Sequence, residues 1–180
     1  MKAIRVHQFG GPEVPQVEEV QSASPGPGTI LIRVRAAGVN PYDTYMRSGA
    51  YGARNPALPY TPGSNAAGTI EALGPDANRF KTGDRVFTTG TVTGANAEHC
   101  RVEQVQKLPE GVSYIRMARA STFHTLPRIA RFSNSRMPSG GIAGWVSKAC
   151  HWIRSALASA PEGHRRVMET SASGKIVLIP

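Results

Sequence analysis

The sequence has little of several things, and each shortage excludes a class of protein. Its 180 residues include only two cysteines, Cys100 and Cys150, too few for a disulfide framework or a four-cysteine metal site. This cysteine usage favours a reducing compartment. No apolar run approaches the about 20 residues that span a bilayer, and the N-terminus lacks an apolar stretch of signal-peptide length. We therefore expect a soluble, cytoplasmic protein with no membrane partner.

Acidic residues are also scarce, with 12 Asp and Glu against 21 Lys and Arg, a net charge of +9. Nearly all of this charge imbalance lies between Ile115 and Arg166, a segment with nine basic residues and a single acidic one, Glu162. Two interpretations stay open. The segment has an origin different from the rest of the chain, or the chain is a non-catalytic basic protein that binds RNA. In the second case Trp145, His151 and Trp152 would stack on bases.

Glycine and proline, in contrast, are plentiful, at 19 and 14 residues, and predict many turns and a β-rich fold. Alternation of polar and apolar residues between these turns predicts a small barrel or sandwich of short strands. The expected strands are Lys2–His7, Thr29–Ala36, Ala66–Leu73, Arg85–Phe87 and Ala97–Val105.

A short helix is predicted over Pro41–Ser48. Asn40 is a suitable N-cap, Pro41 suits the first helical position, and Gly49 suits the C-terminal stop. Tyr42, Tyr45 and Met46 would then share one face of the helix, because positions three and four apart are neighbours.

After Tyr114 the strand pattern ends. A loosely amphipathic helix is conceivable over Trp145–Leu157. Gly163–Thr170 is expected to be helical, and Gly174–Pro180 is expected to form an apolar strand.

Three blocks carry a resemblance to a known family: GVNPYDTYMRSGAY (Gly38–Tyr51), LPYTPGSNAAGTIEALG (Leu58–Gly74) and KTGDRVF (Lys81–Phe87). Together they resemble the zeta-crystallin-like quinone oxidoreductases, zinc-independent members of the medium-chain dehydrogenase superfamily. The resemblance runs from Met1 to about Ser113 and resumes in the final HRRVMETSASGKIVLIP.

The resemblance implies a mainly β fold with short helices, namely a GroES-like β-barrel catalytic domain whose terminal strand returns to the barrel. We expect the GroES-like domain over residues 1–114 and a divergent basic segment, loosely ordered or partly helical, over 115–162. Residues 163–180 are expected to form a C-terminal helix and strand that rejoin the barrel.

The resemblance also implies a zinc-free site. Zinc-dependent relatives have a cysteine at the position of Asn40 and a His-Glu pair at Ser64-Asn65, and catalytic zinc needs about three Cys, His or carboxylate ligands. His99 and Cys100 are neighbours, but on a strand they would point to opposite faces. We expect no metal.

The family chemistry is transfer of a hydride or electrons from NADPH to a quinone, for which the protein supplies orientation and hydrogen bonds. By resemblance, the catalytic candidates are Asn40, Tyr45 and Tyr51, and the cofactor-binding candidates are Asn40, Tyr45 and Ser64. An alternative stays open, in which Asn40 only caps the helix and Tyr45 only packs in the barrel wall.

The family pattern fails where a Rossmann domain is expected, because Tyr114 to His164 leaves no room for repeated βαβ units. Ser139–Gly144 echoes a phosphate-binding turn but has the wrong spacing and no preceding strand, so a flexible loop is expected. We hypothesise a spliced, truncated or mispredicted form with weak NADPH binding, little activity and no oligomer interface.

Overall fold

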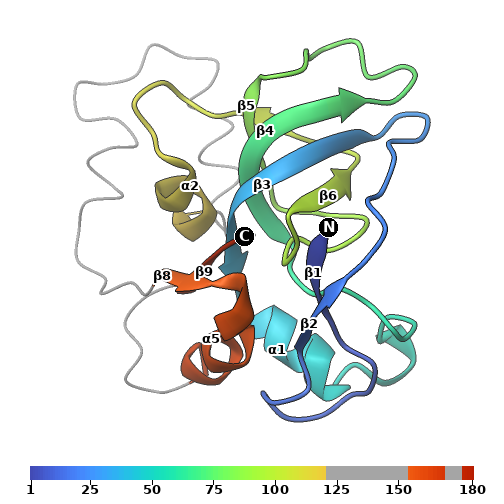
Figure 1. Ribbon diagram of the computed structural model, residues 1–180, viewed down its shortest axis with the longest axis vertical. Helices are drawn as coiled ribbons and strands as arrows, with labels where there is room; N and C mark the ends of the chain where they lie inside the picture. Colours follow the sequence, from blue (N-terminus) through green and yellow to red (C-terminus); the bar gives the residue numbers. More distant parts are fainter. Residues whose placement is uncertain (121–153, 169–175) are drawn as a thin grey trace.

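The fold is built mainly from strands, with a few short helices, as predicted (Figure 1). The computed structural model describes residues 1–120, 154–168 and 176–180. Its elements are, in chain order, β1 (Lys2–Arg5), β2 (Gln16–Glu19), β3 (Ile30–Val39), α1 (Pro41–Ser48), the 3-10 turn η1 (Gly52–Arg54), β4 (Asn65–Leu73), β5 (Arg85–Thr88), β6 (His99–Val102), β7 (Gln106–Lys107), α2 (Tyr114–Ala120), β8 (Arg154–Ala156), the 3-10 turn η2 (Leu157–Ser159), α5 (Ala160–Arg166) and β9 (Ile176–Ile179).

Strand β3 organises the sheet. One of its edges pairs antiparallel with β4 along nearly its whole length. The other edge is divided, because β6 pairs with residues 30–33 and β9 pairs with residues 37–39. The register between β3 and β4 shifts at two places, Leu31/Ile32 and Val34/Ala36. Such bulges bend a strand and increase its twist, and Figure 1 shows β3 and β4 curving together.

The core lies against this curved pair. Apolar side chains of β1, β3, β4, β5, β6 and β9 form one buried cluster, to which Leu157 and Ala160 also belong. A second cluster joins β3, β4, β5 and β9 to α2 through Phe87, Met117 and Val177. The contacts of α2 with β3, β4 and β9 hold this helix against one side of the sheet. Residues on both sides of position 114 therefore pack on the same sheet.

The end of the chain joins the sheet. β9 pairs antiparallel with β3, and β8 pairs parallel with β9, so β9 lies between them. Its side chains Ile176, Val177 and Leu178 are buried. The strand expected over Gly174–Pro180 is thus present as β9, and the helix expected over Gly163–Thr170 is present as α5, which begins three residues earlier.

Other expectations need correction. The prediction of a helix over Trp145–Leu157 is wrong at its C-terminal end, because Arg154–Ala156 forms β8 and Leu157 begins η2. Residues 145–153 lie outside the described residues. The free edge of β9 offers backbone groups that need partners, and this pairing outweighs a weak helical pattern. The strand expected over Ala97–Val105 is limited to β6, and β2 was not expected at all. No helix among the described residues has the length and apolar character needed to cross a membrane.

Candidate functional site

Helix α1 begins with a network of hydrogen bonds around Asn40. The backbone N–H of Asn40 donates to Oδ2 of Asp43 at 2.7 Å, and its amide Nδ2 donates to the same oxygen at 3.2 Å. At the other end, Gly49 has a left-handed backbone (φ 81°), and its N–H donates to the carbonyl of Met46. The helix has the bounds that the sequence predicted because both of its end signals are local.

Ser64 meets the same network from the segment before β4. The amide Nδ2 of Asn40 lies 3.4 Å from Oγ of Ser64, and this hydroxyl in turn donates to Oδ1 of Asn65 at 3.3 Å. Two of the predicted cofactor-binding residues, Asn40 and Ser64, are therefore direct neighbours although 24 residues separate them in the sequence.

Beside this network lies a groove of about 540 Å³, a volume in the range of sites for small organic ligands. One wall comes from α1, another from residues 56–64 and a third from residues 89–94. The groove is lined, among others, by the side chains of Arg5, Tyr42, Asp43, Met46, Tyr60, Thr61 and Ser64.

Glycines allow the second and third walls to meet. Gly63 has a φ of +100°, and a Cβ there would lie 2.6 Å from Oδ1 of Asn96. Gly94 has a φ of +86°, and a Cβ there would lie 2.1 Å from the carbonyl oxygen of Thr61. Any larger residue at either position would meet both a strained backbone and a steric clash, so the narrow groove depends on these two glycines.

The predicted tyrosines occupy different places. Tyr42 and Met46, predicted to share a helix face, both line the groove. Tyr45 does not line it, and 45% of its surface is exposed. Tyr51 is also outside the lining, but its ring packs on that of Tyr42 with centroids 5.5 Å apart. Of the predicted site residues, only Ser64 lines the groove directly, with Asn40 hydrogen-bonded to it and Tyr51 in a tilted ring contact with Tyr42.

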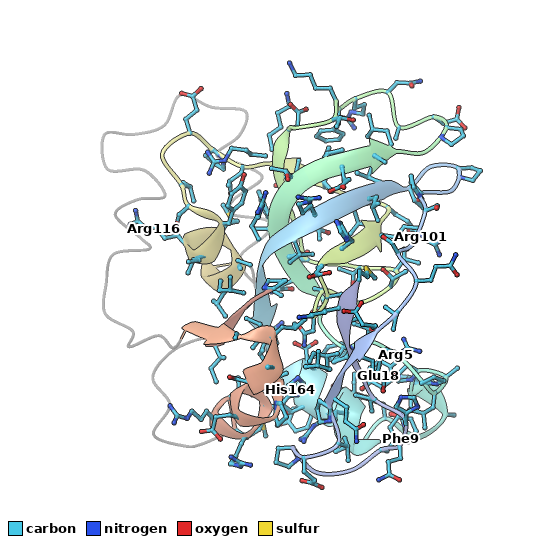
Figure 2. All side chains as sticks on the ribbon, in the orientation of Figure 1. Arg5, Phe9, Glu18, Arg101, Arg116 and His164 are labelled. Carbon is cyan, nitrogen blue, oxygen red and sulfur yellow. The ribbon has the colours of Figure 1, made fainter. Side chains whose placement is uncertain are left out.

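Two residues with polar side chains that line the groove, Arg5 and Tyr60, were not predicted from the sequence as site residues. Arg5 reaches the groove from β1, and Tyr60 reaches it from the proline-rich segment (Figure 2 labels Arg5). Tyr60 lies in the block Leu58–Gly74 that carries the resemblance, but neither residue was predicted as a site residue, and only the tertiary structure brings them to α1. Burial, with the nearby charge of Asp43, raises the pKa of Tyr60 to about 12, so this phenol stays protonated at neutral pH.

Polar side chains are buried where α1 meets the C-terminal helix. Arg47 on α1 is 5% exposed, and burial lowers its pKa. His164 on α5 is fully buried, and neither ring nitrogen has a hydrogen-bond partner among the described residues. Burial, followed by the charge of Arg47, lowers the pKa of His164 to about 4. The imidazole is therefore neutral at physiological pH.

A second, larger groove of about 820 Å³ lies elsewhere on the barrel, lined by Phe80, Phe87, Val105 and their neighbours. It shares residues 89–92 with the first groove but contains none of the predicted site residues. We therefore take the smaller groove beside α1 as the candidate site.

Comparison with known proteins places this geometry in a family. Residues 26–127, more than half of the chain, match the alcohol dehydrogenase GroES-like domain. The chain belongs to this family. The predicted GroES-like fold is thereby confirmed.

Within the GroES-like family, the chain is similar to quinone oxidoreductases, which confirms the predicted resemblance. The chain is 41% identical over 188 residues to quinone oxidoreductase of Lama guanicoe, covering 96% of this chain and 57% of that protein. It is 50% identical over 117 residues to the human quinone oxidoreductase, covering 63% of this chain and 35% of that protein. The matched region thus spans between about a third and little more than half of the length of these two relatives.

A solved structure extends the comparison. Escherichia coli quinone oxidoreductase, solved in complex with NADPH, superposes with a TM-score of 0.66 at 32% identity, covering 77% of this chain and 43% of that one.

In this GroES-like chain, no cluster of three His, Cys, Asp or Glu side chains that could hold a metal occurs among the described residues. Cys100 is fully buried on β6, and burial raises the pKa of its thiol to about 12.

Proposed function

We propose that this chain carries the substrate side of a site that transfers a hydride or electrons from NADPH to a quinone. The observation that carries the proposal is the groove beside α1, where an aromatic ring, Tyr42, and a hydrogen-bonding network, Asn40 to Ser64, lie together. A quinone is a flat apolar ring with polar oxygens, and such a groove offers partners for both parts.

The donors present also suit the reactive end of NADPH. Ser64 lines the groove, where its oxygen can accept from a carboxamide N–H, or its hydroxyl can turn from Asn65 to donate to a quinone oxygen. Asn40 lies behind it and holds the Ser64 oxygen. When bound, the cofactor supplies the hydride, and the protein supplies binding and orientation. Hydroxyl and amide groups are not the usual ligands of catalytic zinc, so the proposed site works without a metal.

The roles of the remaining candidates follow from their positions. Tyr51 supports the ring of Tyr42 from behind and so fixes the apolar wall. Tyr45, exposed outside the groove, would act from its rim on a ligand larger than the groove itself. Tyr60, kept protonated by burial, adds a neutral phenol to the wall rather than a charge.

We further propose that this chain alone turns over slowly. The pyrophosphate of a dinucleotide is normally bound by a glycine-rich turn at a helix N-terminus that follows a parallel strand. Across residues 1–120, 154–168 and 176–180, the structure contains no such unit. Ser139–Gly144 lies outside the described residues, so weak NADPH binding is part of this proposal.

The experiment is a coupled measurement of binding and turnover. Calorimetric titration with 9,10-phenanthrenequinone should detect binding, and an Asn40→Ala, Ser64→Ala double variant should weaken it. NADPH oxidation with the same quinone should stay below about 1 per second, the lower end of ordinary enzymes. Turnover in the ordinary range would refute the proposal of slow activity, and absence of quinone binding would refute the proposed site.

No observation in the structure favours RNA binding over this function. Trp145, His151 and Trp152, the residues expected to stack on bases, lie outside the described residues. The cytoplasmic location, the loss of an oligomer interface and the division at residues 114 and 162 remain predictions.

A further inference from the structure

Arg5 occupies the wall of the groove in a fixed position. It is the last residue of β1, and its guanidinium makes two hydrogen bonds to the neighbouring wall. One runs from Nη2 to the carbonyl of Pro59 at 2.9 Å, and the other runs from Nη1 to Oγ1 of Thr61 at 3.3 Å. Both acceptors belong to residues that also line the groove, so the cation is held at the site itself.

Nothing among the described residues neutralises this charge. None of the ion pairs of the described chain includes Arg5. A guanidinium has five N–H donors, and these two bonds use two of them. Among the described lining residues there is one acid, Asp43, which is 3% exposed and already accepts hydrogen bonds from Asn40. Arg5 is the one basic residue that lines the groove, and it keeps donors for a ligand.

Apolar side chains also line the groove. Tyr42, Met46, Pro56 and Pro62 provide a surface for a flat ring. A ligand that matches both features has a planar apolar body and one negatively charged group, since an oxyanion accepts paired hydrogen bonds from a guanidinium.

We infer that Arg5 determines substrate specificity, favouring quinones that carry an acidic substituent such as a sulfonate or carboxylate. This inference rests on the proposed function, because it assigns the groove to the quinone. The phosphates of the cofactor are the alternative partner of the cation. However, a whole dinucleotide exceeds the small-ligand scale of a 540 Å³ groove, which suits one ring system with its substituent.

The test compares two probes of nearly equal shape, 9,10-anthraquinone-2-sulfonate and its neutral 2-sulfonamide. Neither has an open quinoid carbon to which a cysteine thiol adds. Dissociation constants are measured by calorimetry for the wild type, Arg5→Gln, Arg5→Lys and Arg54→Gln. Arg54 is the matched control, since it is an exposed arginine on η1 outside the groove.

The wild type should bind the sulfonate about tenfold more tightly than the sulfonamide, a difference of about 1.4 kcal/mol. Arg5→Gln should abolish this preference without changing the sulfonamide affinity. Arg5→Lys should keep part of it, and Arg54→Gln should keep all of it. Raising the salt concentration should reduce the preference, because exposed charges are screened. Urea unfolding of Arg5→Gln establishes that the variant is folded.

Equal affinities of the two probes for the wild type, or a preference that survives Arg5→Gln, would overturn the inference and leave the proposed function intact. Absence of binding by both probes would instead remove the proposed function. If Arg5→Gln weakens NADPH and leaves the sulfonate preference unchanged, the cation belongs to the cofactor and the inference is wrong.

Discussion

At the scale of single residues, Asn40 has two roles that can be separated. Its position before α1 and its bonds with Asp43 are structural, whereas its contact with Ser64 faces the groove network. The two interpretations of Asn40, a helix cap alone or also a group of the site, therefore both stay predictions. A polar residue that satisfies a helix end can also present an amide toward a ligand.

The first prediction concerns this cap. Asn40→Ala should lower the free energy of unfolding by about 1 kcal/mol, because it removes the hydrogen bonds of the Asn40 amide to Asp43 and Ser64. Urea unfolding followed by circular dichroism measures it. Ser48→Ala, at the exposed C-terminal end of the same helix, should change stability by less than about 0.5 kcal/mol. Equal effects of the two substitutions would contradict the assigned cap.

The second prediction concerns His164. Its pKa of about 4 in the folded chain lies below the ordinary 6.5, so the unfolded chain binds the proton more readily. Stability should therefore be lost as the pH falls from 6.5 toward 4, by about 3 kcal/mol at most. His164→Gln, which does not titrate, should flatten this part of the pH profile of the unfolding free energy. A profile that His164→Gln leaves unchanged would refute this assignment.

At the scale of elements, β9 links the two ends of the chain. It pairs with β3 from the first part and with β8 from the last, and its side chains enter both hydrophobic clusters. The terminal strand is therefore part of the core rather than an attachment to it.

The third prediction measures that contribution. Leu178 is fully buried in the larger cluster, so Leu178→Ala should destabilise the fold by about 2–5 kcal/mol, the range for deleting a buried leucine side chain. Val17→Ala on β2, where 41% of the valine is exposed, should have a much smaller effect. Thermal and urea unfolding of both variants provide the comparison. A cost below about 1 kcal/mol at Leu178 would indicate that β9 is not an integral strand.

Elements differ in how far the sequence predicts them, for physical reasons. The bounds of α1 were predicted because Asn40, Pro41 and Gly49 carry local information about where a helix begins and ends. β8 was missed because its stability comes from a parallel partner more than 20 residues away, which local periodicity does not reveal. β2 was missed because most of it is exposed, so it shows no alternation of buried and exposed residues.

At the scale of the whole molecule, the sequence predicted the family and the α1 corner of the site but not the whole groove. Asn40 and Ser64 came from motif blocks that resemble relatives, and the structure brings them together. Arg5 and Tyr60 lie 55 residues apart and are brought together by the bridge between Val6 and Tyr60 and by the hydrogen bonds of Arg5 to Pro59 and Thr61. A contact of this kind depends on tertiary pairing, so a motif search does not find it.

The central claim is that the groove beside α1 binds a quinone although the chain spans little more than half the length of its relatives. Its most direct test is a titration of isotope-labelled protein with 9,10-anthraquinone-2-sulfonate, followed by nuclear magnetic resonance. Saturable shifts should appear at Tyr42, Thr61 and Ser64 and be absent from the larger groove around Phe80 and Val105. Shifts confined to the larger groove, or none that saturate, would contradict the account.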